Sequence, residues 1–376
     1  MNLFLSAGEE SGDLHASYLA RELSRLAPGV ELAGMGGARM REAGVRTLVA
    51  SEGHGVVGFV EVIARFGKLR RDLNTLTAAM RERRGALVAV DYGGFNARLV
   101  SRAKRAGLKT FYYIPPKLWA WGKHRGRELA RNLDLVLAVF PFEVPFWESL
   151  GVRVRYVGHP LLDITRPDAA AASRLGLGAG ARYLLVMPGS RRIELANIWP
   201  RVAAALPAIM RACPDVAVVV AAGPAVGAAA LERFAAVPAG VVVTAERAVD
   251  LMPGAAAAVA ASGTATLELA LVGTPALVLY RVNTLTWELG RRLVYVRHLG
   301  LPNIIAGGPI VPELLQGDVR PDNIAAETIR LLTDNDQRQR IAAAYAAVRA
   351  ALVPPAADGA TAPARAARLI LETLAA

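Results

Sequence analysis

The chain has 376 residues, of which 53% are hydrophobic, and a formal net charge of +12. This length exceeds a usual single core and predicts two domains. The single Cys213 excludes an intramolecular disulfide and a cysteine-rich metal site, which indicates a reducing compartment and hence the cytoplasm.

The positive charge indicates anionic partners, but no nucleic-acid-binding module, basic tail or secretory signal is recognisable. Residues 251–280 contain one charge, Glu268, and are broken by Pro253-Gly254, Ser262-Gly263-Thr264 and Gly273-Thr274-Pro275. This stretch therefore predicts core elements rather than a membrane-spanning helix. The five histidines have no paired spacing, so we expect no bound metal. We also expect no cofactor.

Short apolar runs separated by helical stretches predict a doubly wound parallel sheet in each half of the chain. The runs of the first half are residues 3–6, 87–90, 110–114 and 135–138. Those of the second half are residues 183–187, 216–221, 240–244, 255–261 and 276–280. Two such halves predict a ligand cleft between domains, at the carboxyl ends of the strands.

The segment between the two series, residues 157–168, predicts a hinge. We expect an N-terminal domain over residues 1–165 and a C-terminal domain over residues 166–345. Residues 346–376 predict a helix, a break at Pro354-Pro355 and a final helix from about Ala362. We expect this tail to cross back onto the first domain.

The first strand is followed by Gly8-Glu9-Glu10-Ser11-Gly12-Asp13 and then by a helix over residues 14–26. The loop carries three carboxylates, which would repel a phosphate, so it suits sugar hydroxyls or a proton acceptor. An ordinary turn with acidic residues at a helix start explains the same pattern equally well.

Residues 57–71 predict an amphipathic helix. Its apolar stripe comprises Phe59, Val60, Ile63 and Phe66, and its flanks carry Arg65, Lys68, Arg70 and Arg71. Such a helix can lie on an anionic membrane surface, although a half-buried helix of a soluble domain shows the same stripe.

Asp91 ends an apolar strand, where a carboxylate is costly unless it is paired or used. We therefore take it as the candidate general base, with a structural cap of the next helix as the alternative. Past the following strand lie Trp119 and Trp121 with Lys117, Lys123 and Arg125. Indole faces stack on sugars or acyl chains and the cations suit a phosphate, whereas a core tryptophan pair is the equally plausible alternative.

Two turns of the second half predict a diphosphate site. Gly189, Ser190 and Arg191 follow the strand over residues 183–187, and arginine matches phosphate oxygens. Ser262, Gly263 and Thr264 start another helix, where backbone N–H groups and the helix dipole favour an anion. Glu268, one turn further on, could accept hydrogen bonds from a ribose. The alternatives are a solvated helix start and an ordinary capped helix.

Ten short motifs, in this order along residues 5–316, resemble those of the lipid-A-disaccharide synthase family. The first five are Ala7-Gly8-Glu9-x-Ser11-Gly12-Asp13, Gly34-x-Gly36-Gly37, Gly58-x-x-Glu61-Val62, Asp91-x-x-x-Phe95-Asn96 and Trp119-Ala120-Trp121. The others are Pro141-Phe142-Glu143, Val157-Gly158-His159-Pro160, Pro188-Gly189-Ser190-Arg191, Ser262-Gly263-Thr264-Ala265-Thr266-Leu267-Glu268 and Leu301-Pro302-Asn303. Each is short, but the ordered set is specific.

The resemblance implies an α/β GT-B fold with two Rossmann-like doubly wound domains, and a metal-free inverting hexosyltransferase of lipid A and lipopolysaccharide biosynthesis. Its substrates would be UDP-2,3-diacylglucosamine and 2,3-diacylglucosamine 1-phosphate, and its products a β-1,6 disaccharide 1-phosphate and UDP. The implied roles place Asp91 as the base. Gly189, Ser190, Arg191, Ser262, Gly263, Thr264 and Glu268 would bind the nucleotide. Glu9, Ser11, Gly12, Asp13, Asn96, Trp119, Trp121 and Arg125 would line the acceptor site. The helix with Phe59, Val60, Ile63, Phe66, Lys68, Arg70 and Arg71 would dock peripherally on the cytoplasmic face of the inner membrane.

The chain departs from the family pattern at Gly93-Gly94, where a proline and a second carboxylate are usual, and at Gly122, where a basic residue is common. Both departures concern the acceptor side. They leave open a related UDP-sugar enzyme, with another acceptor or of the 2-epimerase kind, and a catalytically inactive nucleotide-sugar or lipid-binding protein. An oligomer is also possible.

Overall fold

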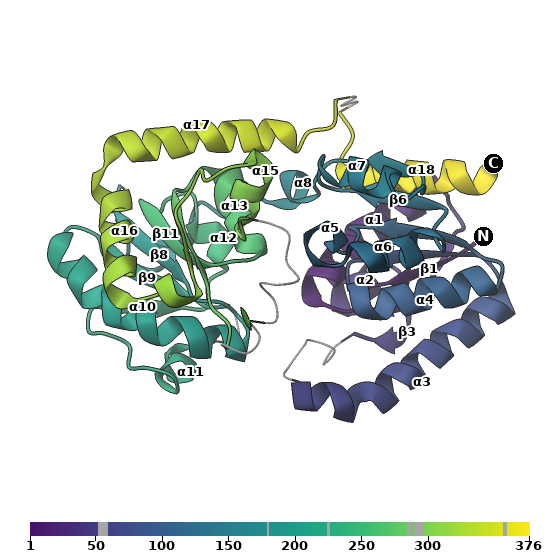
Figure 1. Ribbon diagram of the computed structural model, residues 1–376, viewed down its shortest axis with the longest axis horizontal. Coiled ribbons are helices and arrows are strands. Elements are labelled where there is room, and N and C mark those ends of the chain that lie inside the picture. The colour runs from purple at the N-terminus through teal and green to yellow at the C-terminus, as the bar shows by residue number, and fades with distance from the viewer. Residues whose placement is uncertain (52–58, 179, 224–225, 284–286, 289–296, 356–358) are drawn as a thin grey trace. The chain divides into compact units, whose positions relative to one another are not determined.

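A computed structural model describes residues 1–51, 59–178, 180–223, 226–283, 287–288, 297–355 and 359–376, without the side chains of residues 59–66, 121 and 123. Its contacts divide the chain into two compact units (Figure 1). Unit 1 comprises Met1–Asp163 together with Leu352–Ala376, and unit 2 comprises Ile164–Ala351.

Unit 1 is built on a parallel sheet that has seven strands in the described residues, ordered β3-β2-β1-β4-β5-β6-β7. The strands are β1 (Asn2–Ser6), β2 (Glu31–Gly36), β3 (Arg46–Ala50), β4 (Ala86–Val90), β5 (Lys109–Tyr113), β6 (Leu135–Ala138) and β7 (Val154–Tyr156). All residues of β4 are buried, as expected for a central strand covered on both faces.

Helices cover both faces of this sheet. They are α1 (Glu10–Leu26), α2 (Ala38–Glu42), α3 (Phe59–Arg83), α4 (Gly93–Arg105), α5 (Leu118–Trp121), α6 (Lys123–Ala130), α7 (Glu143–Glu148), α8 (Leu161–Ile164, whose last residue is assigned to unit 2) and α18 (Ala362–Ala375). One face packs on α3, α4, α6 and α7 through a cluster that includes Phe4, Leu76, Leu99 and Trp147. On the other side of the sheet, α18 packs against α1 and β5. The end of the chain is therefore part of unit 1.

Unit 2 repeats this architecture with a parallel sheet of six strands in the described residues, ordered β10-β9-β8-β11-β12-β13. The strands are β8 (Tyr183–Met187), β9 (Ala217–Ala221), β10 (Val241–Thr244), β11 (Ala257–Ala261), β12 (Ala276–Tyr280) and β13 (Glu313–Leu315). The helices are α9 (Ala171–Arg174), α10 (Arg192–Ala212), α11 (Ala228–Glu232), α12 (Ala248–Leu251), α13 (Thr264–Val272), α15 (Leu301–Ala306), η1 (Gln316–Asp318), α16 (Pro321–Thr333) and α17 (Asn335–Ala351).

The predicted α/β class with two parallel doubly wound sheets is confirmed. Every strand predicted from an apolar run is present within one or two residues of its predicted ends. Sequence reasoning missed β2, β3, β7 and β13, of which β3, β7 and β13 are sheet edges. Edge strands bury less of their surface, so charged residues such as Arg46 and Glu313 interrupt their apolar pattern.

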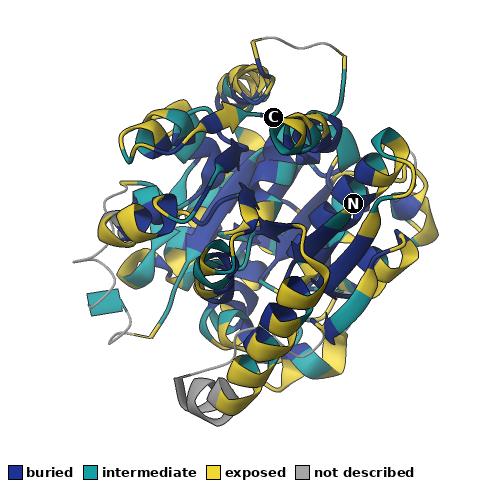
Figure 2. Cartoon of the chain, turned by 90° about the vertical axis from the view of Figure 1, so that its right-hand side faces the viewer, coloured by how far each residue is buried: buried dark blue, intermediate teal, exposed yellow. Residues whose placement is uncertain are grey.

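Burial follows the layers. In Figure 2 the buried residues lie mainly along the strands and on the inner stripes of the helices, whose outer sides are exposed. In the part of the chain that the structure describes, no helix combines the length and the apolar character needed to cross a bilayer.

Candidate functional site

Each sheet has a point where neighbouring strands lead to helices on opposite sides, and four of the loops predicted to be functional follow the strands at these points. In unit 1 this point lies between β1 and β4, and in unit 2 between β8 and β11. Ligands of open α/β sheets bind at such points, outside the carboxyl ends of the strands. The loops of Glu9 and Asp91 follow β1 and β4, and those of Arg191 and Ser262 follow β8 and β11.

The loops after β1 and β4 touch directly. A Cβ atom added at Gly8 would lie 2.1 Å from Cδ1 of Tyr92, so only glycine allows this approach. The Tyr92 ring also stacks on Phe95, with 5.6 Å between centroids. The glycine of the first loop is therefore needed to seat the loop that carries Asp91.

Asn96 holds the two strand ends together from the interior. Its Nδ2 donates to the carbonyl oxygens of Ser6 at 3.0 Å, Val90 at 3.2 Å and Asp91 at 2.9 Å. Its Oδ1 accepts from the Ser6 hydroxyl at 2.6 Å. Asn96 is fully buried, so its side chain binds backbone groups of the Asp91 loop and presents no surface to a ligand.

Backbone strain concentrates at the ends of β4 and β5. Asp91 and Tyr92 both have a φ of +49°, and the β-branched Ile114 has a φ of +56°. Such conformations cost free energy in residues other than glycine and gather at functional sites. Asp91 itself is half-buried, and its carbonyl oxygen accepts a hydrogen bond of 2.7 Å from the Tyr112 hydroxyl. The candidate base thus sits on a strained, well-anchored turn.

The predicted residues of the acidic loop after β1 differ in their exposure to solvent. Glu9 and Ser11 are half-buried at the start of α1, whereas Gly12 and Asp13 are buried. The Asp13 carboxylate accepts backbone hydrogen bonds from Gly37 at 2.6 Å, Arg39 at 3.1 Å and Met40 at 3.2 Å. It thereby caps α2, and of the predicted acceptor residues in this loop only Glu9 and Ser11 present side-chain surface.

The loop after β5 brings Trp119 to the same edge of the sheet. Its indole Nε1 donates to Oε1 of Glu143 at 3.2 Å, and its ring packs edge-on against Phe142 with centroids 4.8 Å apart. The side chain of Trp121 lies outside the described residues, and Arg125 is exposed on α6. Sequence reasoning named Lys117 as one of the cations after this strand and Glu143 as part of a motif, but it gave Glu143 no role of its own.

Lys117 joins the candidate base electrostatically to Glu143. Lys117 is exposed as a residue, but desolvation of its ammonium group still lowers the pKa of that group. The charges of Asp91 and Glu143 oppose this change. Unit 1 therefore carries the Asp91 carboxylate, the Lys117 ammonium group and the Trp119 indole at the carboxyl ends of β4 and β5.

In unit 2, the turn after β8 is held by a residue that the sequence analysis did not assign. Glu194 Oε2 accepts from the backbone N–H groups of Ser190 at 3.1 Å and Arg191 at 3.3 Å, and Arg191 Nη1 lies 3.4 Å from Oε1. Gly189 has a φ of +109°, and a Cβ atom there would lie 2.5 Å from Glu194. Ser190 and Arg191 are exposed, so their side chains are accessible to a ligand.

The turn after β11 presents an accessible helix start. Gly263 and Thr264 are exposed, and the Ser262 hydroxyl donates to the Leu299 carbonyl at 2.8 Å, which ties this turn to the segment before α15. Glu268 is half-buried one turn into α13. Burial raises the pKa of its carboxyl group, and Arg247 opposes that shift. Arg247 in turn forms an ion pair with Asp250, with 2.6 Å between Nη2 and Oδ1.

The predicted membrane-contact residues lie on α3, away from these loops in the chain. Lys68, Arg70 and Arg71 are exposed. The side chains of Phe59, Val60, Ile63 and Phe66 lie outside the described residues. Among the residues that the structure describes, no three His, Cys, Asp or Glu side chains are grouped to hold a metal ion.

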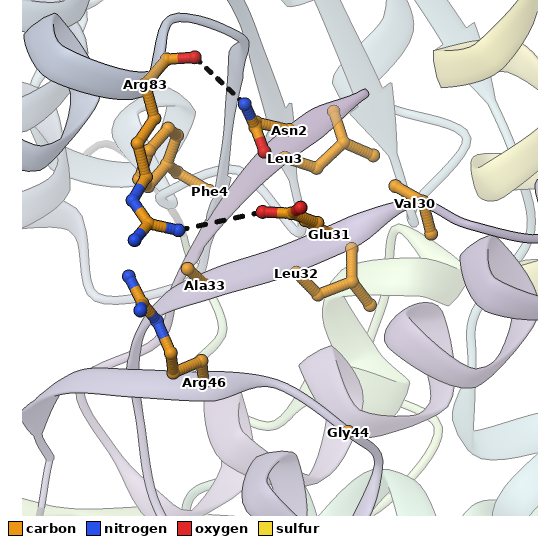
Figure 3. Close-up of a pocket in the computed structure, with 10 residues that line it drawn as sticks. All are labelled: Asn2, Leu3, Phe4, Val30, Glu31, Leu32, Ala33, Gly44, Arg46 and Arg83. Carbon is orange, nitrogen blue, oxygen red and sulfur yellow. Dashed lines mark hydrogen bonds and ion pairs between the residues drawn. The ribbon is translucent and has the colours of Figure 1, made fainter.

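A cavity of about 310 Å³ lies at the amino ends of strands in the unit 1 sheet, opposite to the carboxyl ends that carry the loops described above (Figure 3). It is lined by the amino ends of β1, β2 and β3 and by Arg83, which pairs with Glu31 at 3.6 Å. None of the predicted site residues lines it.

Comparisons with known proteins indicate the family and the fold to which the chain is related. The family described as lipid-A-disaccharide synthetase matches residues 3–359. The lipid-A-disaccharide synthase of Geobacter sulfurreducens is 42% identical over 353 residues, which cover 92% of each chain.

Two solved structures share the fold. UDP-GlcNAc 2-epimerase from Neisseria meningitidis, bound to UDP-GlcNAc, superposes with a TM-score of 0.68 at 12% identity over 100% of this chain and 99% of that chain. MurG of Acinetobacter baumannii superposes with a TM-score of 0.60 at 14% identity over 99% of each chain. At these identities the likeness shows the fold alone, which is that of GT-B glycosyltransferases. The family match and the sequence identity together show that this chain belongs to the lipid-A-disaccharide synthase family.

Proposed function

We propose that the chain is an inverting glycosyltransferase that joins UDP-2,3-diacylglucosamine to 2,3-diacylglucosamine 1-phosphate. The products are the β-1,6 disaccharide 1-phosphate and UDP. The observation that carries the proposal is the family match over residues 3–359, which includes the loops after β1 and β4 and those after β8 and β11. The chemistry of those loops supports it.

On the acceptor side, Asp91 takes the proton of the 6-hydroxyl group as that oxygen attacks the anomeric carbon of the donor. The new carbon–oxygen bond forms as the bond to the diphosphate breaks, so UDP leaves and the configuration inverts. The strained turn after β4 and the Asn96 hydrogen bonds support this role, because a base must be held in place before reaction.

On the donor side, the exposed turns after β8 and β11 hold the nucleotide. Arg191 and the backbone N–H groups of the Ser262-Gly263-Thr264 turn stabilise the charge that develops on the departing diphosphate. Gly189 and Ser190 let the ligand approach the start of α10, and Glu268 accepts from the ribose hydroxyls. For the diphosphate to bind there, the guanidinium of Arg191 must exchange its contact with Glu194 for phosphate oxygens.

The acceptor is bound by Glu9 and Ser11, whose side chains are reachable, and by Trp119, Trp121 and Arg125. Gly12, Asp13 and Asn96 support that surface from the interior. The protein acts peripherally on the cytoplasmic face of the inner membrane, where acylated substrates reside. The exposed cations Lys68, Arg70 and Arg71 on α3 support docking on anionic lipid.

The direct test is incubation of the purified protein with radiolabelled donor and with acceptor, followed by separation of the products. We expect disaccharide 1-phosphate and UDP in equal amounts. Turnover of UDP-N-acetylglucosamine without disaccharide would instead indicate an enzyme of the 2-epimerase kind. Binding of either substrate without any turnover would indicate a catalytically inactive binding protein.

A further inference from the structure

Glu143 is a buried carboxylate that the reaction described above does not use. It is 1% exposed and lies at the start of α7, directly after the loop that follows β6. Its Oε2 accepts from the backbone N–H groups of Val139 at 3.1 Å and Phe140 at 3.2 Å. Its Oε1 accepts from Nε1 of Trp119 at 3.2 Å. One side chain therefore joins the loops after β5 and β6.

Burying this carboxylate is costly, and its surroundings compensate only in part. Burial raises the pKa of Glu143 to about 7, although the hydrogen bonds from Phe140, Val139 and Trp119 and the charge of Lys117 lower it. A carboxyl group retained at such a cost needs a function that an apolar side chain would not supply.

The neighbours of Glu143 belong to the proposed acceptor site. Trp119 is half-buried, with its Nε1 edge on Glu143 and its ring against Phe142, so two contacts fix the orientation of the indole. Lys117, from the same loop as Trp119, feels both Glu143 and Asp91. Glu143 thus connects the indole, the cation and the candidate base.

We infer that Glu143 is a positioning residue of the acceptor site: its carboxylate fixes the Trp119 indole and the loop after β5 so that the acceptor sugar is held against Asp91. This inference rests on the proposed function. Glu143 does not touch the reacting atoms. Its loss affects how the acceptor is held, and the donor, which is bound by unit 2, is unaffected.

The variant that tests this is Glu143→Gln, which keeps the size of the side chain and removes its charge. The matched control is Glu148→Gln, an exposed glutamate on the same helix. We expect kcat/KM for the acceptor to fall roughly tenfold or more in Glu143→Gln, as for a lost charge-assisted buried hydrogen bond, with the KM of the donor unchanged. Trp119→Phe, which removes the same hydrogen bond from the other side, should have a similar effect, and the double variant should be no worse than either alone.

The pH dependence separates positioning from a purely structural role. Above pH 7 the ionised carboxylate is the stronger acceptor for the indole N–H, and as the pH falls through about 7 the group is protonated and that hold weakens. We therefore expect the acceptor KM of the unaltered protein to rise from pH 8 to pH 6, and that of Glu143→Gln to be high throughout.

The other groups near Glu143 do not produce this change. Burial raises the pKa of Tyr156 and lowers that of His159 well below its usual value, so both stay neutral in this window. Burial lowers the pKa of the Lys117 ammonium group, and the charges of Asp91 and Glu143 oppose that shift. The acceptor phosphate titrates near pH 6 in every variant, so the difference between variants isolates Glu143.

A readout independent of turnover is tryptophan fluorescence, with Trp119→Phe as the reference that removes the signal of this indole. We expect a transition near pH 7 in the unaltered protein and in Glu148→Gln, and none in Glu143→Gln. The inference is overturned if Glu143→Gln keeps the transition, or if it keeps the acceptor KM and its pH dependence. If the unaltered protein makes no disaccharide, the proposed function fails, whereas the fluorescence transition still decides whether Glu143 controls Trp119.

Discussion

Arg191 stands where a helix start, a glycine turn and an acidic side chain meet. Its guanidinium lies 3.4 Å from Glu194, which also accepts from its backbone N–H group. If it exchanges this exposed contact for the diphosphate, Arg191→Ala should weaken UDP binding about 10- to 100-fold, as for charge-assisted hydrogen bonds. It should also lower kcat at saturating donor, because the same guanidinium stabilises the departing diphosphate. Calorimetric titration with UDP measures this, and Arg192→Ala, one residue on, is the matched control. Equal UDP affinity in both variants would refute the phosphate role of Arg191.

Asn96 supplies four hydrogen bonds between the ends of β1 and β4. Asn96→Ala leaves these buried groups without their partner, so we expect a loss of about 2 to 4 kcal/mol in unfolding free energy. Denaturant unfolding tests this, with Asn74→Ala as control because Asn74 makes an exposed hydrogen bond to Arg102. A loss no larger than that of the control would show that Asn96 does not hold the strand ends.

For single residues, the sequence identified those that follow the strand ends but not all of their hydrogen-bond partners. Asp91 could be singled out because a carboxylate after an apolar strand is costly. Asp13 and Asn96 were expected to contact the ligand. In the structure both are buried, and their side chains form hydrogen bonds with backbone groups. Glu194 and Glu143 were given no role, because their partners are set by turns and packing that a residue pattern does not specify.

Among the elements, the buried strands were predictable and most of the edge strands were not. Continuous apolar runs such as 183–187 and 276–280 give β8 and β12 with the predicted bounds. The central strand β2 was missed because Gly34 and Gly36 shorten its apolar run. The resulting order nevertheless determines the site, because it places β1 beside β4 and β8 beside β11.

Helix α3 carries a prediction about membranes. Lys68, Arg70 and Arg71 are exposed on one stretch of this helix, and the charge of each should add about 1 kcal/mol of attraction to anionic lipid. Changing all three to glutamine should reduce sedimentation with phosphatidylglycerol vesicles, and added salt should reduce that of the unaltered protein. The control changes three exposed arginines elsewhere in unit 1, Arg21, Arg25 and Arg41, to glutamine. Equal loss in both triple variants would mean that net charge, rather than α3, drives association.

In the whole molecule, unit 1 is formed by two separate segments of the chain, whereas unit 2 is formed by one. Unit 1 requires the C-terminal segment, since Ala362 N donates to Asp163 at 2.7 Å and Arg365 Nε donates to the Val157 carbonyl at 2.9 Å. Unit 2 is continuous from Ile164 to Ala351 and has its own sheet and core cluster. The sequence indicated a returning tail, but the residue at which it leaves unit 2 depends on tertiary contacts.

This division predicts that a fragment of residues 164–351 binds UDP by itself. All proposed nucleotide contacts lie inside it, so its dissociation constant should be within about threefold of that of the full chain, a difference below 1 kcal/mol. Circular dichroism first establishes that the fragment is folded, and calorimetry then gives the affinity. A folded fragment that does not bind UDP would show that unit 1 contributes to the nucleotide site.

In the proposed reaction, Asp91 acts on the acceptor in unit 1 while unit 2 holds the nucleotide. The most direct measurement compares single-turnover disaccharide formation and UDP affinity in Asp91→Asn and in the unaltered protein. We predict a fall in rate of roughly 100-fold or more, the contribution of a positioned general base, with UDP affinity unchanged. Disaccharide formation at an unaltered rate, or a matching loss of UDP affinity, would contradict the role of Asp91 as the base.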